Sequence, residues 1–236
     1  MTFQEYSKGV RQGIPVGLGY FSVSFGFGTM AAAHGIDALT ATLISATNLT
    51  SAGQFAGLTL IVAGTTLWEL ILTMLVINSR YSLMSLALSQ RMGNKIGFLP
   101  RLLIAYINTD EIFALAMAEP KPLTVSFLLG LGLTPVIGWT GGTLAGALAG
   151  SVLPESMGAA LGVMLYGMFI AIVIPPARQE KPVFYTVILA LIFSCCFAWL
   201  PGLKEISSGL AIVIATVAAS AICAWRFPTG EEEVSQ

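Results

Sequence analysis

Charged residues are scarce in this chain, and their scarcity limits the class of protein. Only 10% of its 236 residues are charged, whereas 56% are hydrophobic and the mean hydropathy is +0.83. Soluble domains carry about 25% charged residues. The composition therefore predicts an all-α, polytopic helical membrane protein that lies in a lipid bilayer. The net charge of −1 argues against a nucleic-acid partner.

Cysteine and histidine are also few. The three cysteines, Cys195, Cys196 and Cys223, lie in apolar runs without metal-ligand spacing, so we expect reduced packing residues and neither a metal nor another cofactor. The single histidine, His34, adjoins Gly35 in an expected turn, which favours an incidental role over a proton relay. No nucleophile–base pair or phosphate-binding loop occurs, so the sequence does not predict an enzyme.

Long apolar runs are abundant instead. A helix needs roughly 20 mostly apolar residues to cross a bilayer. The candidate segments are 15–33, 38–63, 67–88, 102–118, 124–148, 158–174, 183–200 and 206–225. We expect roughly seven or eight of them to form transmembrane helices, within a single integral membrane domain over residues 1–236.

Two of these segments, 38–63 and 124–148, fit a simple crossing poorly. If all segments cross and the N-terminus is cytoplasmic, the lysines and arginines outside the spans divide six to four, a weak bias. A hairpin at 38–63 moves residues 91–101 to the cytoplasmic side but moves Arg178 and Lys181 away from it. Broken segments in corresponding positions are a feature of inverted-repeat transporters. We therefore expect 38–63 to be broken or re-entrant, with 124–148 as the second candidate and an inverted repeat as the matching architecture.

The clearest sign of a break is the stretch ATNLTSAGQF, residues 46–55. Asn48, Gly53 and Gln54 interrupt a run that is otherwise apolar. Irregular backbone at membrane depth is tolerated where it lines a cavity. The stretch therefore predicts two half-helices that meet near residues 49–53 and turn their free ends toward a cavity.

Four ionisable side chains lie inside predicted spans, where each costs about 2.5–3.5 kcal/mol to insert. Glu69, at the start of segment 67–88, is typical of a helix end at the headgroups. Arg80 either extends to the headgroups or is a buried guanidinium that binds an anionic group or an internal carboxylate. Asp110 and Glu111 either begin a helix that restarts after Asn108 and Thr109, or form a functional site.

Four amides accompany these charges: Asn48, Gln54, Asn78 and Asn108. A single amide could join two helices. Four amides together with the charges predict a shared polar cavity. We therefore expect residues 13–118 to form the substrate-site half and residues 122–226 to support it.

Four motifs occur in a characteristic order. They are GIPVGLGYFSVSFGFGTMAAAHG (13–35), SATNLTSAGQF (45–55), INSRYSLMSLAL (77–88) and NTDEIFALA (108–116). In order and spacing they resemble the AzlC family, the large subunit of branched-chain amino acid exporters. The resemblance extends over essentially the whole chain and is strongest over residues 13–118.

The resemblance implies a multi-pass protein of the bacterial inner membrane. It implies export of leucine, isoleucine, valine and sometimes methionine, driven by the proton-motive force, with a small AzlD-type membrane subunit as partner. The motif positions carried over are Pro15, Gly26, Gly53, Gln54, Phe55, Arg80, Asp110 and Glu111. The turn before Gln54 is more polar here than the family's usual glycine–alanine run, so a strictly aliphatic substrate follows less directly.

A zwitterionic amino acid fits these groups. Arg80 or free helix N–H groups would bind its carboxylate, and Asp110 or Glu111 its ammonium group. An apolar pocket would form from Phe25, Phe27, Phe55 and Phe113. The predicted substrate-binding residues are Asn48, Gly53, Gln54, Phe55, Asn78, Arg80 and Asn108, and the predicted proton-coupling residues are Asp110 and Glu111. The alternative function is a channel or an assembly subunit without its own transport cycle, in which the polar groups only join helices.

Overall fold

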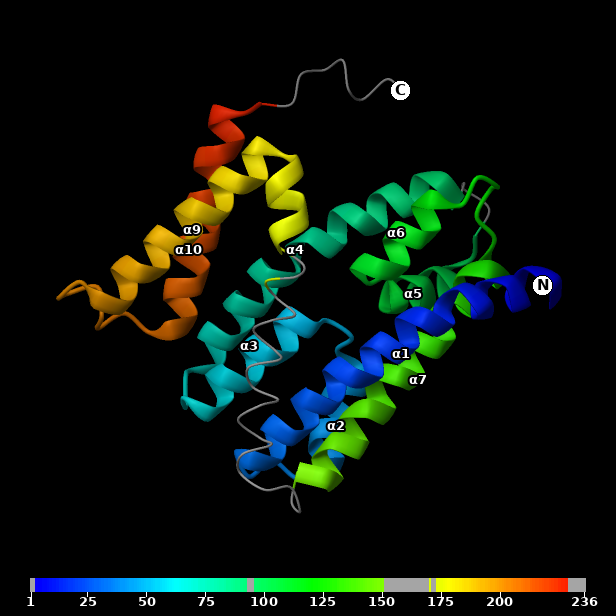
Figure 1. Cartoon of the computed structure of the whole chain (residues 1–236), viewed down its shortest axis with the longest axis horizontal. Helices are drawn as coiled ribbons and strands as arrows, with labels where there is room; N and C mark the ends of the chain where they lie inside the picture. Colours follow the sequence, from blue (N-terminus) through cyan, green and yellow to red (C-terminus); the bar gives the residue numbers. More distant parts are fainter. Residues whose placement is uncertain (1–2, 93–95, 151–169, 171–172, 229–236) are drawn as a thin grey trace. The chain divides into compact units, whose positions relative to one another are not determined.

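The long helices account for most of the structure. The computed structural model describes residues 3–92, 96–150, 170 and 173–228, and every regular element in that part is an α-helix (Figure 1). Five helices are long and apolar enough to cross a membrane. They are α1 (Phe3–Ala33), α4 (Leu67–Met92), α7 (Val125–Gly150), α9 (Lys181–Trp199) and α10 (Ser208–Arg226). The predicted polytopic helical membrane fold is therefore confirmed.

Within residues 38–118, four helices are too short to cross a bilayer by themselves. They are α2 (Ala38–Thr47), α3 (Ser51–Val62), α5 (Phe98–Ile107) and α6 (Asp110–Ala118). Segments 38–63 and 102–118 each divide into two of these helices, and segment 158–174 lies almost entirely outside the described residues. These facts explain why the five candidate spans are fewer than the number that the sequence predicts.

The predicted break in segment 38–63 is confirmed, and Asn48 forms it. Asp37 caps the start of α2 by accepting a hydrogen bond from the Thr40 backbone N–H (3.0 Å). At the other end, the Asn48 side-chain oxygen accepts from the Thr50 hydroxyl (3.0 Å) and backbone N–H (3.3 Å). This local turn competes with helical hydrogen bonding, so the chain leaves the helix at residue 48 and restarts at Ser51.

The second break lies in segment 102–118, for which the sequence favours a single helix. The structure has the helix restart after Asn108 and Thr109, and a functional role of Asp110 and Glu111 stays a prediction. Asn108 ends α5, Thr109 is extended (φ −91°, ψ 171°), and α6 begins at Asp110. Asp110 and Glu111 therefore lie in the first turn of α6, where the helix dipole favours negative charge.

The predicted break in segment 124–148 is wrong, because α7 runs as one helix through Pro135. A proline removes one helical hydrogen bond, here the one that would end on the Leu131 carbonyl. That carbonyl lies against Gly13 of α1. Close packing against a second helix thus stabilises α7 where the proline weakens it.

Helices α1 and α7 pack closely and in parallel along most of their lengths. Gly9 lies against Gly130 near one end, and Gly28 lies against Gly146 near the other. A side chain at any of these positions would collide with the facing backbone. Glycine at these positions is therefore what permits the approach of the two helices.

Helices α2 and α3 form a hairpin at the C-terminal end of α1. The Gln54 side chain of α3 donates a hydrogen bond to the Ser45 hydroxyl of α2. One residue later, Phe55 lies edge-to-face with Phe27 of α1 (ring centroids 5.3 Å apart). These contacts hold the start of α3 against α2 and α1, and the hairpin tip is residues 48–50.

Helices α5 and α6 form a second hairpin beside the N-terminal half of α1 (Figure 1). A short link joins the end of α4 to the start of α5. Asn108, at the C-terminal end of α5, donates a hydrogen bond to the Ser85 hydroxyl of α4 (3.1 Å). Helix α6 then runs back toward the C-terminal end of α4. Arg91, near that end of α4, donates hydrogen bonds to the Met117 and Glu119 carbonyls at the end of α6. The tip of this hairpin is residues 108–110.

The chain divides into two compact units, residues 1–58 with 78–163 and residues 59–77 with 164–236. These borders differ from those of the predicted halves, 13–118 and 122–226, and the division of roles between the halves stays a prediction. In the second unit α9 and α10 pack antiparallel, with the Tyr185 ring stacked on Phe227 (5.6 Å). The three cysteines are free thiols.

Candidate functional site

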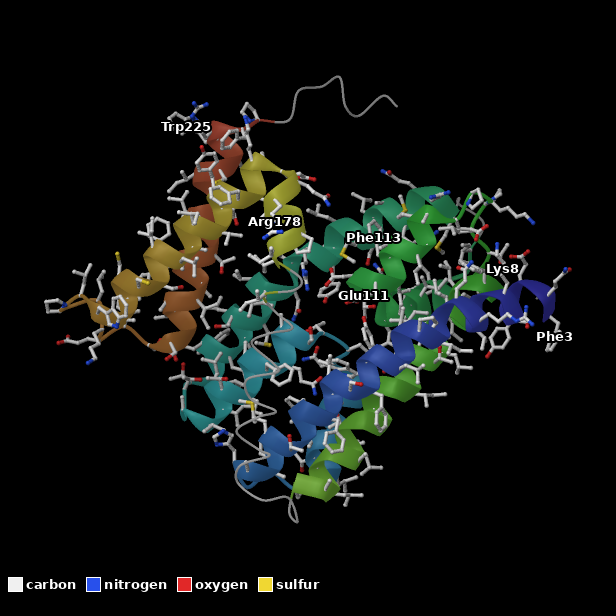
Figure 2. All side chains as sticks on the ribbon, viewed as in Figure 1. Phe3, Lys8, Glu111, Phe113, Arg178 and Trp225 are labelled. Carbon is white, nitrogen blue, oxygen red and sulfur yellow. The ribbon has the colours of Figure 1, made fainter. Side chains whose placement is uncertain are left out.

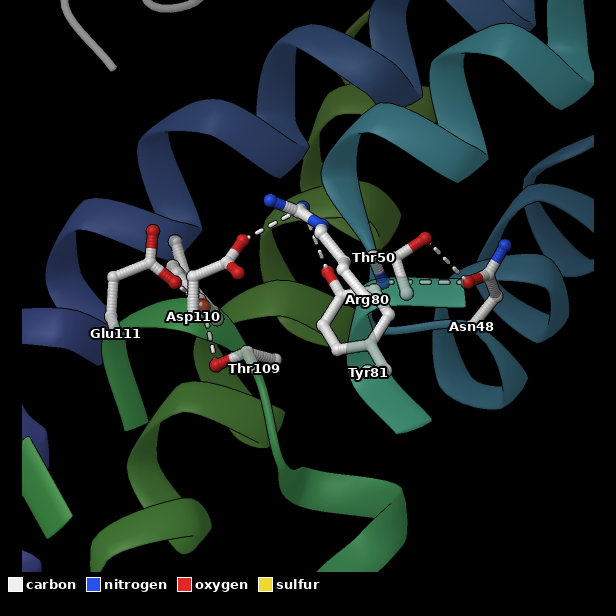
Figure 3. A network of polar contacts seen from close by, with 8 residues as sticks. Asn48, Thr50, Arg80, Tyr81, Thr109, Asp110 and Glu111 are labelled. Carbon is white, nitrogen blue, oxygen red and sulfur yellow. Dashed lines mark hydrogen bonds and ion pairs between the residues drawn. The ribbon is translucent and has the colours of Figure 1, made fainter. Parts of the chain in front are cut away.

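The two hairpin tips and the middle of α4 bring polar side chains together within the first unit (Figure 3). The tips leave backbone groups without helical partners: carbonyls at the ends of α2 and α5, and N–H groups at the starts of α3 and α6. One of these carbonyls, that of Ala46, accepts a hydrogen bond from the Tyr106 hydroxyl of α5. The two hairpins are therefore joined directly at their tips.

An ion pair lies at the centre of the site. The Arg80 Nη2 atom of α4 and the Asp110 Oδ2 atom of α6 are 2.8 Å apart. Their side chains are 46% and 41% exposed, so neither is sealed inside the protein. The Arg80 guanidinium also donates to the Tyr81 hydroxyl (3.2 Å) and lies 5.0 Å from the centre of its ring. Arg80 thus binds an internal carboxylate, as one of the two alternatives from the sequence expects, but its guanidinium is not buried as that alternative expects.

The neighbouring carboxylate has a different environment. The Tyr20 hydroxyl of α1 donates to Glu111 and is hydrogen-bonded to the Thr109 hydroxyl (2.7 Å). Adjacent residues on a helix point about 100° apart, which allows Asp110 and Glu111 to face different partners. Figure 2 labels Glu111 and Phe113 on α6, and Lys8 on the N-terminal part of α1.

Three of the predicted substrate-binding residues lie at or beside the tip of the first hairpin: Asn48, Gly53 and Asn78. Asn48 is hydrogen-bonded to Thr50, as described above. Gly53 faces Asn78 of α4, and a Cβ on Gly53 would lie 3.1 Å from the Asn78 Oδ1 atom. That Oδ1 atom is buried and accepts no hydrogen bond within the described part of the chain. Any side chain at position 53 would therefore disturb the contact between the tip and α4.

Gln54 belongs to a buried hydrogen-bond network. Its side chain is 2% exposed. Besides donating to Ser45, it accepts from the Trp139 indole N–H of α7 (2.9 Å). The Ser45 and Thr143 hydroxyls are 2.6 Å apart. Both ends of the Gln54 amide thus contact protein groups that join α2, α3 and α7.

The phenylalanines predicted to form one apolar pocket lie in two different places. Phe27 and Phe55 are buried and pack against each other. Phe113 packs against the hydrophobic core that α5, α6 and α7 share. These residues contribute to helix packing, and the structure does not gather them around the Arg80–Asp110 pair.

Asn108 links the ion pair to a neighbouring cavity. Its side chain is 4% exposed. Its Nδ2 atom donates to Ser85, whereas its buried Oδ1 atom has no hydrogen-bond partner among the described residues. The cavity beside it, between α4 and α5, has a volume of about 330 Å³.

Sequence reasoning missed several side chains that shape the site: Tyr20, Ser45, Tyr81, Trp139 and Thr143. Tyr20 and Tyr81 lie within the quoted motifs, and a phenol within an apolar span is a signal that could have identified them. Ser45, Trp139 and Thr143 meet only through contacts between distant segments. In the part of the chain that the structure describes, no group of three or more His, Cys, Asp or Glu side chains could hold a metal ion.

The site combines a cation, two carboxylates, hydroxyls and free helix ends. These groups are complementary to a small zwitterion, whose carboxylate needs donors and whose ammonium group needs acceptors. Since Arg80 and Asp110 are partly exposed, a ligand can replace either partner without unpacking a sealed core.

Comparisons with known proteins assign the chain to a family. The model of the family described as "AzlC protein" matches residues 15–153. Inner membrane protein YgaZ of Escherichia coli is 27% identical over 78% of this chain and 78% of its own length. An uncharacterized membrane protein of Archaeoglobus fulgidus is 31% identical over 72% of this chain and 75% of its own length. No solved structure matches at a significant level. The chain is therefore a membrane protein that belongs to the AzlC family.

Proposed function

We propose that the chain is a secondary-transporter subunit that exports branched-chain or other hydrophobic amino acids across the bacterial inner membrane. The observation that carries this proposal is the partly exposed Arg80–Asp110 pair between two broken helical segments. Transporters commonly bind substrate where helices are interrupted near the bilayer midplane. Membership of the AzlC family and the likeness to a named inner membrane protein support the proposal.

In the proposed binding step the amino acid exchanges with the ion pair. Its carboxylate accepts from Arg80 and from free N–H groups at the start of α6. Its ammonium group binds Asp110 or the free carbonyls at the ends of α2 and α5. The intact pair neutralises both charges when no substrate is bound, which avoids leaving either charge alone at membrane depth.

We further propose that both hairpins are re-entrant and enter from opposite faces of the membrane. Helices α1 and α7 are parallel, and α4 runs against them, so α1, α4 and α7 would each cross once. One face then receives the lysines and arginines, other than Arg80, that the structure describes in residues 1–150: Lys8, Arg11, Arg91, Arg101 and Lys121. By the positive-inside rule this face is cytoplasmic.

Contacts within the first unit are consistent with that arrangement. Lys8 of α1 donates to Glu119 at the end of α6 (2.7 Å), and this hydrogen bond lowers the pKa of Glu119. Arg91 of α4 donates to the backbone carbonyl of Glu119. The N-terminal end of α1 and the C-terminal ends of α4 and α6 therefore lie at the same end of the unit.

The remaining parts of the proposal rest on the resemblance to the family. Proton coupling would involve Asp110 and Glu111, since protonation of Asp110 would release Arg80 and change substrate affinity. A small AzlD-type membrane subunit is the expected partner. The proposed activity needs no cofactor, no metal and no enzymatic step.

Counterflow in membrane vesicles tests the proposal. Vesicles loaded with leucine, isoleucine, valine or methionine should transiently accumulate trace labelled leucine from outside. A carrier produces such transient accumulation, whereas a channel does not. We expect R80Q and D110N to raise the half-saturating leucine concentration about tenfold or more, equivalent to the loss of one strong contact. R178Q, an arginine change in the second unit, is the matched control and should leave it unchanged.

An imposed pH gradient extends the same test to coupling. E111Q should retain counterflow but lose efflux driven by the gradient, if this carboxylate exchanges protons. Absence of counterflow for all four amino acids in the unaltered protein would overturn the transport proposal. Gradient-driven efflux that persists in both E111Q and D110N would overturn the coupling.

A further inference from the structure

A pocket lies between α9 and α10 of the second unit, at the end where α9 begins and α10 ends (Figure 1). Its volume is about 480 Å³. Each helix contributes residues that recur at the spacing of one helix face. The lining includes Lys181, Tyr185 and Ile188 of α9, and Ile222, Arg226 and Phe227 of α10. We refer to it as the α9–α10 pocket.

Two cations line this pocket without a carboxylate beside them. Lys181 is the first residue of α9, and Arg226 is the last residue of α10. Neither takes part in an ion pair within the described residues, and no described carboxylate lines the pocket. Glu180 precedes Lys181 in the chain but is not a lining residue. Two cations that share a pocket repel each other, so an anion between them would be favoured.

Aromatic rings hold the arginine at the pocket. The Arg226 guanidinium lies 5.5 Å from the centre of the Phe227 ring, and that ring stacks on Tyr185 (5.6 Å). Stacking joins the start of α9 to the end of α10, and the cation–π contact restricts the guanidinium. The positive end of the pocket is therefore built by contacts between the two helices.

The lining changes from charged to aliphatic along the helices. Ile188 follows Lys181 by seven residues, which is about 10 Å along the helix axis at a rise of 1.5 Å per residue. Ile222 lies one helical turn before Arg226. The headgroup region of a bilayer is about 5–8 Å thick on each side of the hydrocarbon core. The pocket thus changes character over the distance that separates headgroups from acyl chains.

The basic end of this helix pair fits the cytoplasmic surface of the membrane. Trp225 at the end of α10 is 84% exposed (Figure 2), and exposed tryptophans are enriched at headgroup level. Arg178 precedes Lys181 by three residues, so three cations lie near this end. Lys204 lies in the link at the other end of the pair. The positive-inside rule therefore assigns the pocket to the cytoplasmic face.

We propose that the α9–α10 pocket binds an anionic phospholipid of the cytoplasmic leaflet. Its phosphate lies between Lys181 and Arg226, and an acyl chain lies against Ile188 and Ile222. A guanidinium donates paired hydrogen bonds to phosphate oxygens, and an ammonium adds a point charge. Basic pockets between transmembrane helices recognise anionic headgroups in this way. A soluble phosphate would match the cations but would leave the aliphatic wall without a partner.

Stabilisation by added lipid tests the site in the full-length protein in detergent. Dioleoyl phosphatidylglycerol should raise the unfolding temperature saturably, whereas dioleoyl phosphatidylcholine and glycerol 3-phosphate should not. In K181Q/R226Q the lipid concentration that gives half of this shift should rise about twentyfold, since each basic residue near an anionic headgroup contributes about fivefold. R178Q/K204Q removes two cations that do not line the pocket, and this matched control should keep the shift.

Photocrosslinking to the unaltered protein gives a second readout if K181Q/R226Q is unstable. The probe is a phosphatidylglycerol with a diazirine in its acyl chain. After irradiation and digestion, adducts should concentrate in the peptides that contain Ile188 and Ile222. Unlabelled phosphatidylglycerol should reduce these adducts more than phosphatidylcholine does at the same concentration.

Each other result overturns a definite part of the proposal. No shift with phosphatidylglycerol, an equal shift with phosphatidylcholine, or equal losses in the two double variants would exclude a specific anionic site. An equal shift with glycerol 3-phosphate would exclude the lipid in favour of a soluble phosphate. Adducts spread over all helices would exclude the pocket as the binding place. Leucine counterflow is not part of these measurements, so the proposed function stands or fails separately.

Discussion

At the scale of single residues, the site gives two adjacent carboxylates different partners. Asp110 contacts Arg80 and is 41% exposed. Glu111 accepts from Tyr20, whose side chain is buried. The first carboxylate is thus free to exchange its partner, while the second joins α6 to α1. A movement of the Glu111 side chain would therefore change the hydrogen bond that joins α6 to the Tyr20 hydroxyl of α1.

Gln54 provides a residue-scale prediction. Q54A removes the acceptor of the buried Trp139 indole N–H, whereas the Ser45 hydroxyl keeps Thr143 as a partner. An unsatisfied buried group costs about 1–3 kcal/mol. We expect a clear loss of thermal stability in detergent, with the half-saturating leucine concentration changed less than about twofold. Q90A, at an exposed position of α4, is the control and should melt like the unaltered protein. A tenfold change in leucine affinity at unchanged stability would instead support the direct substrate contact that the sequence suggests.

Gln54 also shows where sequence reasoning stops at this scale. A polar residue inside an apolar run signals a buried polar contact, and the structure has such a contact. The sequence cannot name the partner, because Trp139 lies 85 positions away on α7. Arg80 and Asp110 were easier to connect, since opposite charges at membrane depth have few other ways to be neutralised.

At the scale of elements, the sequence indicates breaks better than it indicates packing. Asn48 and Thr50 form a local turn that depends only on neighbouring residues, and the break there is predicted correctly. Pro135 also suggests a break when only neighbouring residues are considered, but α7 is continuous there. The helix continues because Gly13 lets α1 pack against the proline's turn of α7. That contact connects residues more than a hundred positions apart, which no local pattern reveals.

The α1–α7 contact supplies a prediction with a matched control in the same helix. A Cβ at Gly17 would lie 2.6 Å from the Thr134 carbonyl oxygen, whereas a Cβ at Gly19 would meet nothing within 4 Å. G17A should therefore destabilise the protein by about 1–3 kcal/mol through overpacking. G19A should be neutral or stabilising by up to about 1 kcal/mol, because alanine is the better helix former. Thermal unfolding in detergent measures both, and equal effects of the two changes would refute the close packing of α1 on α7.

At the scale of the whole molecule, helices α1 to α6 show one pattern twice, in opposite directions. A long helix, α1, precedes the α2–α3 hairpin, and a second long helix, α4, precedes the α5–α6 hairpin. Because α4 runs against α1, the two groups have inverted directions. An inverted repeat is the architecture that the sequence predicts, but the breaks fall in 38–63 and 102–118 instead of in 38–63 and 124–148. Whether the two groups are related as repeats stays a prediction.

Cysteine labelling tests the topology proposed for helices α1 to α6. Two re-entrant hairpins require residues 34 and 63 to lie on one face and residues 98 and 121 on the other. A simple crossing of segment 38–63 would separate residues 34 and 63. In cells expressing otherwise cysteine-free protein, H34C and A63C should react with a membrane-impermeant maleimide from outside. F98C and K121C should react only after permeabilisation, because they adjoin the basic residues of the cytoplasmic face. Labelling of H34C without A63C in intact cells would exclude the first re-entrant hairpin and restore the crossing of that segment.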